Sequence, residues 1–290
     1  MNLVLCLPWE GEGKEALFEK ALIFSRVDRP EAVELAGKLA AFLEGRKVKV
    51  YFERGLAAKL NVEGVNPREV EADLAVVVGG DGTVLRAVHS LPREVPLFTV
   101  SMGRVGFFGE VSPEEASAFL GEVLEGKYVE DRHFMVEADV EGLPPALNEI
   151  KIGNENLQRM VDLSIYVDGW KLAEDRMDAV LVSTPSGASA YSLSAGGSIV
   201  DPRLEALLIV PVCPMSSNFK PYIIPASVEV SIVPENILGG LLAISDGLAS
   251  GRVHPPRTVK VRRSKRQVVF LRRGFTFYER IKRRLKLSSV

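Results

Sequence analysis

The stretch Asp73-Leu74-Ala75-Val76-Val77-Val78-Gly79-Gly80-Asp81-Gly82-Thr83 decides the fold of the first part of the chain. Its apolar run is what a parallel strand needs when helices cover both faces of the sheet. The glycines follow at once, and we expect a helix from Thr83 to Ser90. A strand that passes through glycines into a helix is typical of an α/β ligand site at the carboxyl end of a parallel sheet.

The residues around this stretch repeat the alternation of strand and helix. Apolar residues recur every three or four positions between Pro30 and Leu43, which predicts an amphipathic helix with proline in its first turn. We expect buried strands at residues 3–7, 47–52 and 95–100. Ser112-Pro113-Glu114-Glu115 predicts a capping box with proline at the first helical position. These elements indicate an α/β domain over residues 1–127, with a parallel sheet layered between helices.

After Lys127 the pattern changes to short alternating stretches separated by glycine and proline. We expect strands at residues 134–140, 163–167, 228–233, 241–244, 258–261 and 267–271. They predict a second, mostly β domain over residues 128–275, built as a sandwich or as stacked sheets. A helix at residues 277–287 belongs to a C-terminal segment, residues 276–290, that we expect to pack back on the first domain.

Composition excludes several classes of protein. The chain has 290 residues, 47% of them apolar and 26% charged, and a net charge of −2. No apolar run reaches the roughly 18 to 20 residues that span a bilayer. Cys6 and Cys213 are the two cysteines, which disfavours a disulfide framework. We therefore expect a cytoplasmic protein that binds no membrane.

Charged residues between Arg252 and Lys286 are basic except for Glu279. Because Thr258 to Arg262 alternates in strand period, we interpret this segment as a sheet with one solvated basic face. Alternatively, the basic segment could attract a polyanionic substrate or hold an acidic neighbouring domain. Nucleic acid is not an expected partner.

The glycine-rich loop, Gly79, Gly80, Gly82 and Thr83, suits a phosphate site, because glycines allow close approach and the next helix begins with free N–H groups. A loop built only to bind phosphate would exclude a carboxylate, which repels the ligand. Asp81 therefore indicates chemistry, either as a general base toward a hydroxyl or as a ligand of a divalent cation. The spacing matches neither the P-loop nor the dinucleotide-binding G-x-G-x-x-G. We expect a kinase that phosphorylates a hydroxyl.

Polar residues in three later segments are candidates for recognising the acceptor. Asn148 and Glu149 can bind ribose hydroxyls and base edges, although an exposed turn is an equal reading. Small and hydroxylic residues follow the strand that ends at Thr184-Pro185, and Tyr191 offers them one aromatic face. Ser245-Asp246-Gly247 is a late D-G element. The histidines, His89, His133 and His254, lie outside these motifs, and we expect them to be incidental.

The glycine-rich loop resembles the GGDG(T/S) loop that NAD kinases share with diacylglycerol and sphingosine kinases and with phosphofructokinases. Residues 184–197 resemble the NAD kinase signature TPTGSTAYSLSAGG, which the lipid kinases and phosphofructokinases lack. Residues 102–107 resemble the N-x-G-x-L-G-F segment of the same family. Leu248 stands where the family often has glutamine after the late D-G. The resemblance covers about residues 70–250 and implies the fold of the NAD kinase and diacylglycerol kinase group.

This resemblance implies transfer of a phosphoryl group from ATP, or from inorganic polyphosphate, to the 2′-hydroxyl of the adenosine ribose of NAD, giving NADP. It implies Asp81 as the base and Gly82 as a contact of the dinucleotide. Asn148 and Glu149 would hold NAD, and Asp178 would face its nicotinamide end. The remaining implied contacts of NAD are Arg86, Arg159, Arg176, Ser189, Ala190, Tyr191, Ser192, Leu193 and Ser194. Mg²⁺ on the donor phosphates and a homodimer or homotetramer are also implied.

Overall fold

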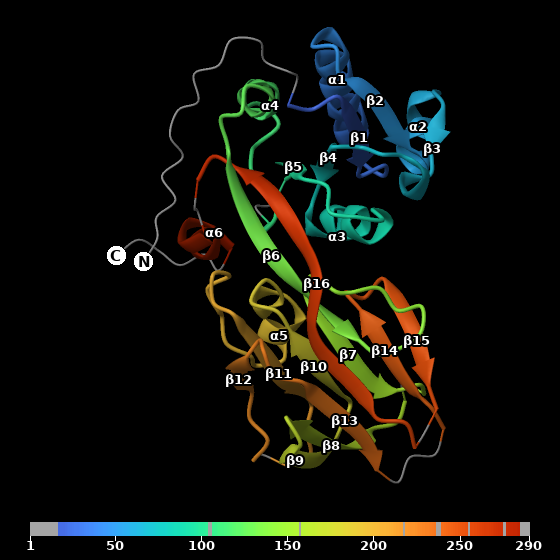
Figure 1. Cartoon of the computed structure of the whole chain (residues 1–290), viewed down its shortest axis with the longest axis vertical. Coiled ribbons are helices and arrows are strands. Elements are labelled where there is room, and N and C mark those ends of the chain that lie inside the picture. Colours follow the sequence, from blue (N-terminus) through green and yellow to red (C-terminus); the bar gives the residue numbers. More distant parts are fainter. Residues whose placement is uncertain are drawn as a thin grey trace.

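Figure 1 shows the computed structural model of the chain, which describes residues 17–103, 106–156, 158–216, 218–235, 239–254, 256–274 and 277–284. The strand predicted at residues 3–7 lies outside this range, as do Arg104 and Val105 of the segment 102–107. Among the described residues, no helix combines the length and apolar character needed to cross a bilayer.

The first part of the chain alternates strands and helices. Its elements are β1 (Lys20–Ser25), α1 (Pro30–Gly45), β2 (Lys49–Glu53), α2 (Arg54–Leu60), β3 (Gly64–Val65), η1 (Pro67–Glu69), β4 (Leu74–Gly79), α3 (Asp81–Ser90), β5 (Leu97–Ser101) and α4 (Ala116–Leu124). The strands lie in the order β3-β2-β1-β4-β5, and all neighbouring pairs are parallel. The parallel sheet predicted from the sequence is confirmed, and β1 joins it without having been predicted.

Strand periodicity explains why helices cover both faces of this sheet. Val76 and Val78 of β4 pack in one core cluster with residues of α1 and α4. Ala75 and Val77, which point the other way, pack with α3. Because alternate side chains of a strand face opposite sides, a strand that is apolar throughout needs a helix on each face.

The capping box predicted at residues 112–115 is only partly right. Ser112 N does donate to the Glu115 carboxylate, at 3.3 Å. However, α4 begins at Ala116, so Pro113 lies before the helix rather than in its first turn. Bonds of the i to i+3 type, from Glu115 N to Ser112 O and from Ala116 N to Pro113 O, form a separate tight turn there.

The second part is mostly β, as predicted. Its elements are β6 (Val129–Ala138), β7 (Glu149–Asn154), β8 (Val161–Val167), β9 (Trp170–Met177), β10 (Ala179–Ser183), η2 (Gly187–Ser189), α5 (Tyr191–Ser194), β11 (Ala206–Val212), β12 (Tyr222–Pro225), β13 (Val230–Glu235), β14 (Leu241–Ser245), β15 (Ala249–Val253), β16 (Val259–Arg272) and α6 (Phe277–Arg284). A six-stranded antiparallel sheet, β12-β11-β10-β7-β14-β15, packs against β16, β13 and β8 through one core cluster. The result is a sandwich.

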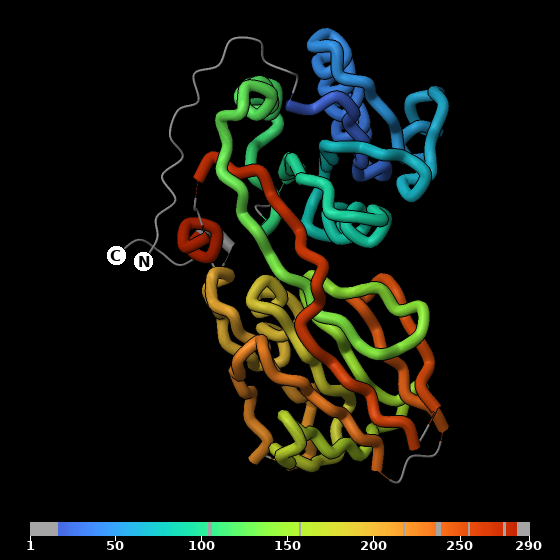
Figure 2. Tube along the Cα trace, in the orientation of Figure 1, coloured from blue at the N-terminus to red at the C-terminus, as the bar shows by residue number. Residues whose placement is uncertain are grey.

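One long strand joins the two parts. β16 pairs with β5 of the parallel sheet at Phe270 and Leu97, and with β13 of the sandwich at Val261 and Val230. β6 runs antiparallel beside β16 along most of this length, as the green and red traces in Figure 2 show. The sheet is therefore continuous between the two parts, and the boundaries 1–127, 128–275 and 276–290 stay a prediction.

The basic segment is largely neutralised by acids of this chain. Lys260, Arg262 and Arg263 of β16 form ion pairs with glutamates at 2.8, 3.0 and 2.7 Å, respectively. Arg273 pairs with Glu115 at 2.8 Å. The strand and its exposed basic side chains were predicted, but the acidic partners come from β6 and from loops far away in the sequence.

Candidate active site

Asp81 lies at the point where β4 passes through Gly80 into α3. Its Oδ2 accepts a hydrogen bond from Phe107 N at 3.0 Å, and its Oδ1 accepts one from Phe108 N at 3.1 Å. A side chain at Gly106 would place its Cβ 2.1 Å from Asp81 Oδ1, so only glycine permits this approach. Asp81 therefore joins the glycine-rich loop to the segment 106–108, which resembled a family motif in the sequence.

Asn148 and Glu149 are held by Asp246, the aspartate of the late D-G element. Its carboxylate accepts hydrogen bonds from Leu147 N, Asn148 N and Glu149 N at 2.8, 2.8 and 3.1 Å. It also lies 2.9 Å from His89 Nε2, which comes from α3. The D-G element thus orients the asparagine–glutamate pair and connects it to the helix that begins at Asp81.

Asn148 and Glu149 are buried, 6% and 7% exposed, so the reading of an exposed turn is wrong. Asn148 Oδ1 and Glu149 Oε2 have no hydrogen-bond partner within the part of the chain that the structure describes. Burial, and then the negative charge of Asp246, raise the pKa of Glu149 to about 8. Buried polar atoms without partners are costly, so this pair suits a polar ligand that completes their hydrogen bonds.

The serine-rich segment packs directly against this pair. Thr184 N donates to Asn148 O at 2.9 Å, and Thr184 Oγ1 donates to Leu147 O at 2.5 Å. A Cβ at Gly187 would lie 2.1 Å from Asn148 O, so glycine is required for the contact. The segment is an ordered turn with η2 and α5 rather than a linker.

The largest of three cavities near these residues, 540 Å³, is called here the arginine cavity. It lies beside Thr83 of the glycine-rich loop and carries Arg68 and Arg86 on its wall. Leu248, at the position where the family often has glutamine, also lines this cavity. Neither arginine forms an ion pair with any acid among the described residues, so both cations remain available to a polyanion.

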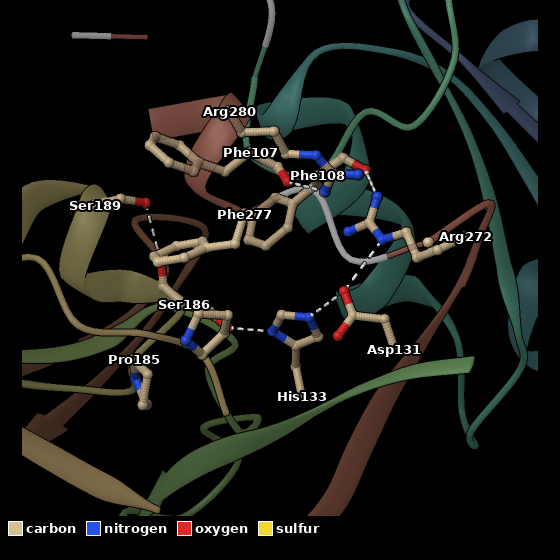
Figure 3. A pocket seen from close by; sticks show the side chains of 12 residues that line it. Phe107, Phe108, Asp131, His133, Pro185, Ser186, Ser189, Arg272, Phe277 and Arg280 are labelled. Atoms are coloured by element: carbon tan, nitrogen blue, oxygen red, sulfur yellow. Dashed lines mark hydrogen bonds and ion pairs between the residues drawn. The ribbon is translucent and has the colours of Figure 1, made fainter. Parts of the chain in front are cut away.

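A second cavity, called here the serine cavity, is far smaller, at 30 Å³. Figure 3 shows Phe107 and Phe108, the residues whose N–H groups hold Asp81, above Ser186 and Ser189. Phe277 and Arg280 of α6 also line this cavity, with Phe277 between Phe107 and Ser186 in this view. Arg280 donates to Phe107 O at 2.8 Å, and its guanidinium also contacts Glu110. The C-terminal helix therefore touches the segment that holds Asp81.

A third cavity, called here the tyrosine cavity, measures 230 Å³ and gathers Arg159, Asp178 and Tyr191. The Lys151 ammonium lies 5.6 Å from the centre of the Tyr191 ring. Of the arginines expected to contact NAD, Arg176 is the exception: its guanidinium forms two hydrogen bonds with Asp162, at 2.7 and 2.8 Å. Its role toward NAD stays a prediction.

The remaining predicted residues surround Tyr191. Ser192 is fully buried, and its hydroxyl contacts that of Ser183. Ser189 Oγ donates to Ser186 O at 3.2 Å. Ala190 and Leu193 are half-buried, and Ser194 is exposed. The candidate site therefore comprises the Asp81 loop, the arginine cavity that Thr83 lines, the serine cavity whose Phe107 and Phe108 hydrogen-bond to Asp81, and the tyrosine cavity.

Comparison with known proteins identifies the family. Residues 21–128 match the family model described as ATP-NAD kinase N-terminal domain, and residues 147–273 match the ATP-NAD kinase C-terminal domain. The chain belongs to the NAD kinase family. NAD kinases are its curated relatives: that of Methanoculleus marisnigri is 36% identical over 269 residues, covering 92% of this chain and 99% of the relative. That of Thermococcus gammatolerans is 36% identical over 271 residues, covering 91% and 98%.

Solved structures agree with this membership. The NAD kinase of Archaeoglobus fulgidus, in complex with ATP, is 25% identical with a TM-score of 0.76, covering 93% of this chain and all of that one. Yeast NADH kinase, complexed with NADH, shares the fold, with a TM-score of 0.83 at 22% identity, covering 97% and 94%. As a NAD kinase, the chain is an enzyme that phosphorylates NAD to NADP with a nucleotide phosphoryl donor.

Several residues at this NAD kinase site were missed by sequence reasoning. His89 contacts Asp246, and His133 contacts Ser186 at 2.6 Å, contacts that sequence reasoning did not foresee; the interpretation of the histidines as incidental stays a prediction. Asp131, Arg272 and Arg280 form the wall of the serine cavity. Asp131 stands two residues from His133 in β6, but Arg272 and Arg280 lie far along the chain from Asp131 and Glu110, and no local spacing signals those contacts.

A divalent cation bound by this NAD kinase would have few protein ligands. Within the described ranges, no three histidine, cysteine, aspartate or glutamate side chains converge. Asp81 is the carboxylate of the glycine-rich loop. Mg²⁺ is commonly held by one or two carboxylates together with substrate phosphates and water. The residues therefore fit a magnesium ion that arrives with the donor.

Proposed function

We propose that Asp81 is the general base that takes the proton from the 2′-hydroxyl of the adenosine ribose of NAD. The observation that carries this proposal is the position of its loop. Thr83 faces the arginine cavity, while the Asp81 carboxylate is bound by the residues that line the serine cavity. An in-line phosphoryl transfer needs donor and acceptor on opposite sides of the reacting group. Each Asp81 oxygen keeps a further lone pair for the hydroxyl.

Residues of the mostly β part of the chain would bind the acceptor, NAD. Asn148 and Glu149 would complete their unmet hydrogen bonds with ribose hydroxyls. Ser189 to Ser194 would line the adenine and ribose pocket, with Gly82 touching the dinucleotide. Asp178 and Arg159 share the tyrosine cavity, which suits the nicotinamide end and its phosphate. Glu149, whose pKa is raised to about 8, can donate a hydrogen bond in its protonated form at neutral pH.

The arginine cavity would bind the phosphoryl donor. Its volume of 540 Å³ is within the range of nucleotide-sized sites, and Arg68 and Arg86 supply positive charge beside the loop. ATP is the donor that we propose, in keeping with the Archaeoglobus relative bound to ATP, and inorganic polyphosphate is the alternative with the same charge. Mg²⁺ held by the donor phosphates would neutralise the charge that develops during transfer.

A homodimer or homotetramer is also proposed. Trp170, Met215 and Ile223 are exposed by 83, 68 and 54%, which suits burial against another copy. Cys213 is an exposed free thiol, which suits a reducing compartment such as the cytoplasm. Light scattering of the purified chain and fractionation of its native cell test these two points.

Incubation of the pure chain with NAD, ATP and Mg²⁺, followed by an assay for NADP, tests the function. We expect NADP with phosphate on the adenosine ribose. No NADP with ATP or polyphosphate, together with phosphorylation of a lipid or sugar, would overturn the proposal. Binding of NAD without turnover would indicate a regulator instead.

A further inference from the structure

A chain of three polar side chains, with the buried His133 at its centre, borders the serine cavity. His133, 7% exposed, places Nδ1 2.6 Å from Ser186 Oγ and Nε2 2.9 Å from Asp131 Oδ2. Figure 3 shows the imidazole lying between the serine and the carboxylate. The ring also meets Phe270 edge-on, with centroids 5.2 Å apart. Packing therefore fixes the direction in which both nitrogens point.

Neighbouring groups determine where the imidazole carries its proton. Burial would raise the pKa of Asp131, but the contact with His133 and the charge and hydrogen bond of Arg272 outweigh it and lower the pKa to about 2. Asp131 is thus an ionised carboxylate, which can only accept a hydrogen bond. With Nε2 2.9 Å from this acceptor, we assign the imidazole proton to Nε2, which leaves the lone pair of Nδ1 toward Ser186.

Charges in the surrounding cluster already balance without a charge on the histidine. Arg272 pairs with Glu110 at 3.1 Å and with Asp131 at 3.2 Å, and Arg280 contacts Glu110. These two guanidinium groups and two carboxylates sum to zero. A neutral imidazole keeps the buried cluster neutral, whereas a charged one would add an uncompensated cation.

A neutral His133 fixes the polarity of the Ser186 hydroxyl. The hydroxyl has one proton, and that proton is donated to Nδ1. What remains for the cavity is the oxygen lone pairs, so Ser186 can accept a hydrogen bond there but cannot donate one. A serine without this histidine could rotate and do either.

Adenine comes close to this hydroxyl if Asp81 acts as proposed. The base is attached to C1′, the ribose carbon next to the one that carries the 2′-hydroxyl. Phe107 and Phe108, which hold Asp81, line the serine cavity with Ser186. Aromatic rings beside a hydroxyl suit the face and the edge of a purine.

We propose that Asp131 and His133 position the Ser186 hydroxyl as a fixed acceptor that selects a purine bearing an exocyclic amine over one bearing an oxo group. This inference rests on the proposed function. Asp131 and His133 are positioning residues, and Ser186 is the specificity-determining contact. An amino group can donate a hydrogen bond to the Ser186 oxygen. An oxo group is itself an acceptor, so it cannot form a hydrogen bond with that oxygen.

The test compares NAD with nicotinamide hypoxanthine dinucleotide, in which an oxo group replaces the adenine amine. For the wild-type chain we expect kcat/KM to favour NAD by about tenfold or more, because an unpaired buried polar group rejects the analogue. His133→Phe keeps a flat ring against Phe270 but frees the serine, so the preference should fall to about threefold or less. Ser186→Ala should lower it equally with a smaller change in packing.

Two further variants separate positioning from folding. In His133→Asn, an amide oxygen near the place of Nδ1 can still accept the serine proton, and part of the preference should return. His254→Phe alters an exposed histidine away from the cavity and should leave the ratio unchanged. The ratio of two substrates does not depend on how much enzyme is folded.

An unchanged ratio in Ser186→Ala, or in a folded His133→Phe, would overturn the inference. So would a wild-type chain that uses both dinucleotides equally. Formation of no NADP at all by the wild-type chain would instead overturn the proposed function, so the two failures are distinguishable.

Discussion

The arginine cavity, which Thr83 lines, and the serine cavity, which is lined by the residues that hydrogen-bond to Asp81, differ in almost every property. The first measures 540 Å³, and its Arg68 and Arg86 form no ion pair with described acids. The second measures 30 Å³, and its arginines are paired with the carboxylates of Glu110 and Asp131. A polyanionic donor needs free cations and room, whereas a neutral base needs a desolvated wall whose charges cancel. The contrast indicates which substrate each cavity accepts.

Asp81 is connected to both cavities through these residues, and its loss has the largest expected effect. Asp81→Asn keeps the side chain's shape but cannot take a proton, so kcat should fall by at least about 10²-fold while NAD still binds. Steady-state kinetics and calorimetric titration with NAD measure the two effects. Asp28→Asn, at an exposed aspartate paired with Arg26, is the matched control. Near-normal turnover in Asp81→Asn would remove this residue from the mechanism.

The pH dependence of stability tests the desolvated environment of Glu149. Its pKa rises from 4.5 to about 8 in the folded chain, because burial and Asp246 disfavour the charged form. The folded chain therefore holds a proton that the unfolded chain releases above about pH 4.5. Relative to Glu149→Gln, the wild-type chain should lose stability as the pH rises from about 4.5 to 8, by on the order of a few kcal/mol.

Urea unfolding at about pH 5 and pH 8 measures this difference. Glu44→Gln, at an exposed glutamate of α1, is the control and should follow the wild-type profile. Parallel profiles for the wild-type chain and Glu149→Gln would mean that Glu149 is charged in the folded state, and the contrast between the two cavities would weaken.

Replacement of Arg86 tests whether the arginine cavity binds ATP. Arg86→Ala removes one unpaired cation from the arginine cavity and should raise the KM for ATP about tenfold, with a smaller effect on the KM for NAD. Added salt should narrow the difference from the wild-type chain. Arg46→Ala, at an arginine stacked on Phe42, removes an equal charge elsewhere. If Arg86→Ala weakens NAD binding more than ATP binding, the arginine cavity binds NAD rather than ATP.

Phe277 gives the smallest effect. Its ring closes the serine cavity, so the base must displace it or rearrange the cavity. Phe277→Ala should lower the KM for NAD about two- to threefold and leave kcat nearly unchanged, because it removes the free energy spent on opening. Trp170→Ala, at an exposed ring, is the control. A raised KM would show that Phe277 is instead part of the wall that binds the base.

Local patterns predicted much of this site. The apolar run before Gly79 predicted the parallel strand, and glycines around Asp81 predicted the strand-to-helix turn, because both depend on neighbouring residues. The resemblance placed Asn148 and Ser189 near the acceptor. The roles of these residues toward NAD stay predictions.

Long-range contacts could not be predicted in the same way. Asp246 orients Asn148 through backbone N–H groups that any residue would offer, so neither sequence position reveals the bond. His133 reaches Ser186 because β6 happens to run beside the serine-rich turn. α6 returns to Phe107 through Arg280, a contact that depends on the whole chain path. Such pairings arise from tertiary structure, and composition or periodicity carries no signal for them.

A crystal structure of Asp81→Asn with NAD, ATP and Mg²⁺ tests the central claim most directly. The account predicts the 2′-oxygen of the adenosine ribose within about 3 Å of the residue 81 amide. It also predicts the γ-phosphate approaching from the arginine cavity and the adenine beside Ser186. A nicotinamide ribose at residue 81, or both substrates on one side of the loop, would contradict it.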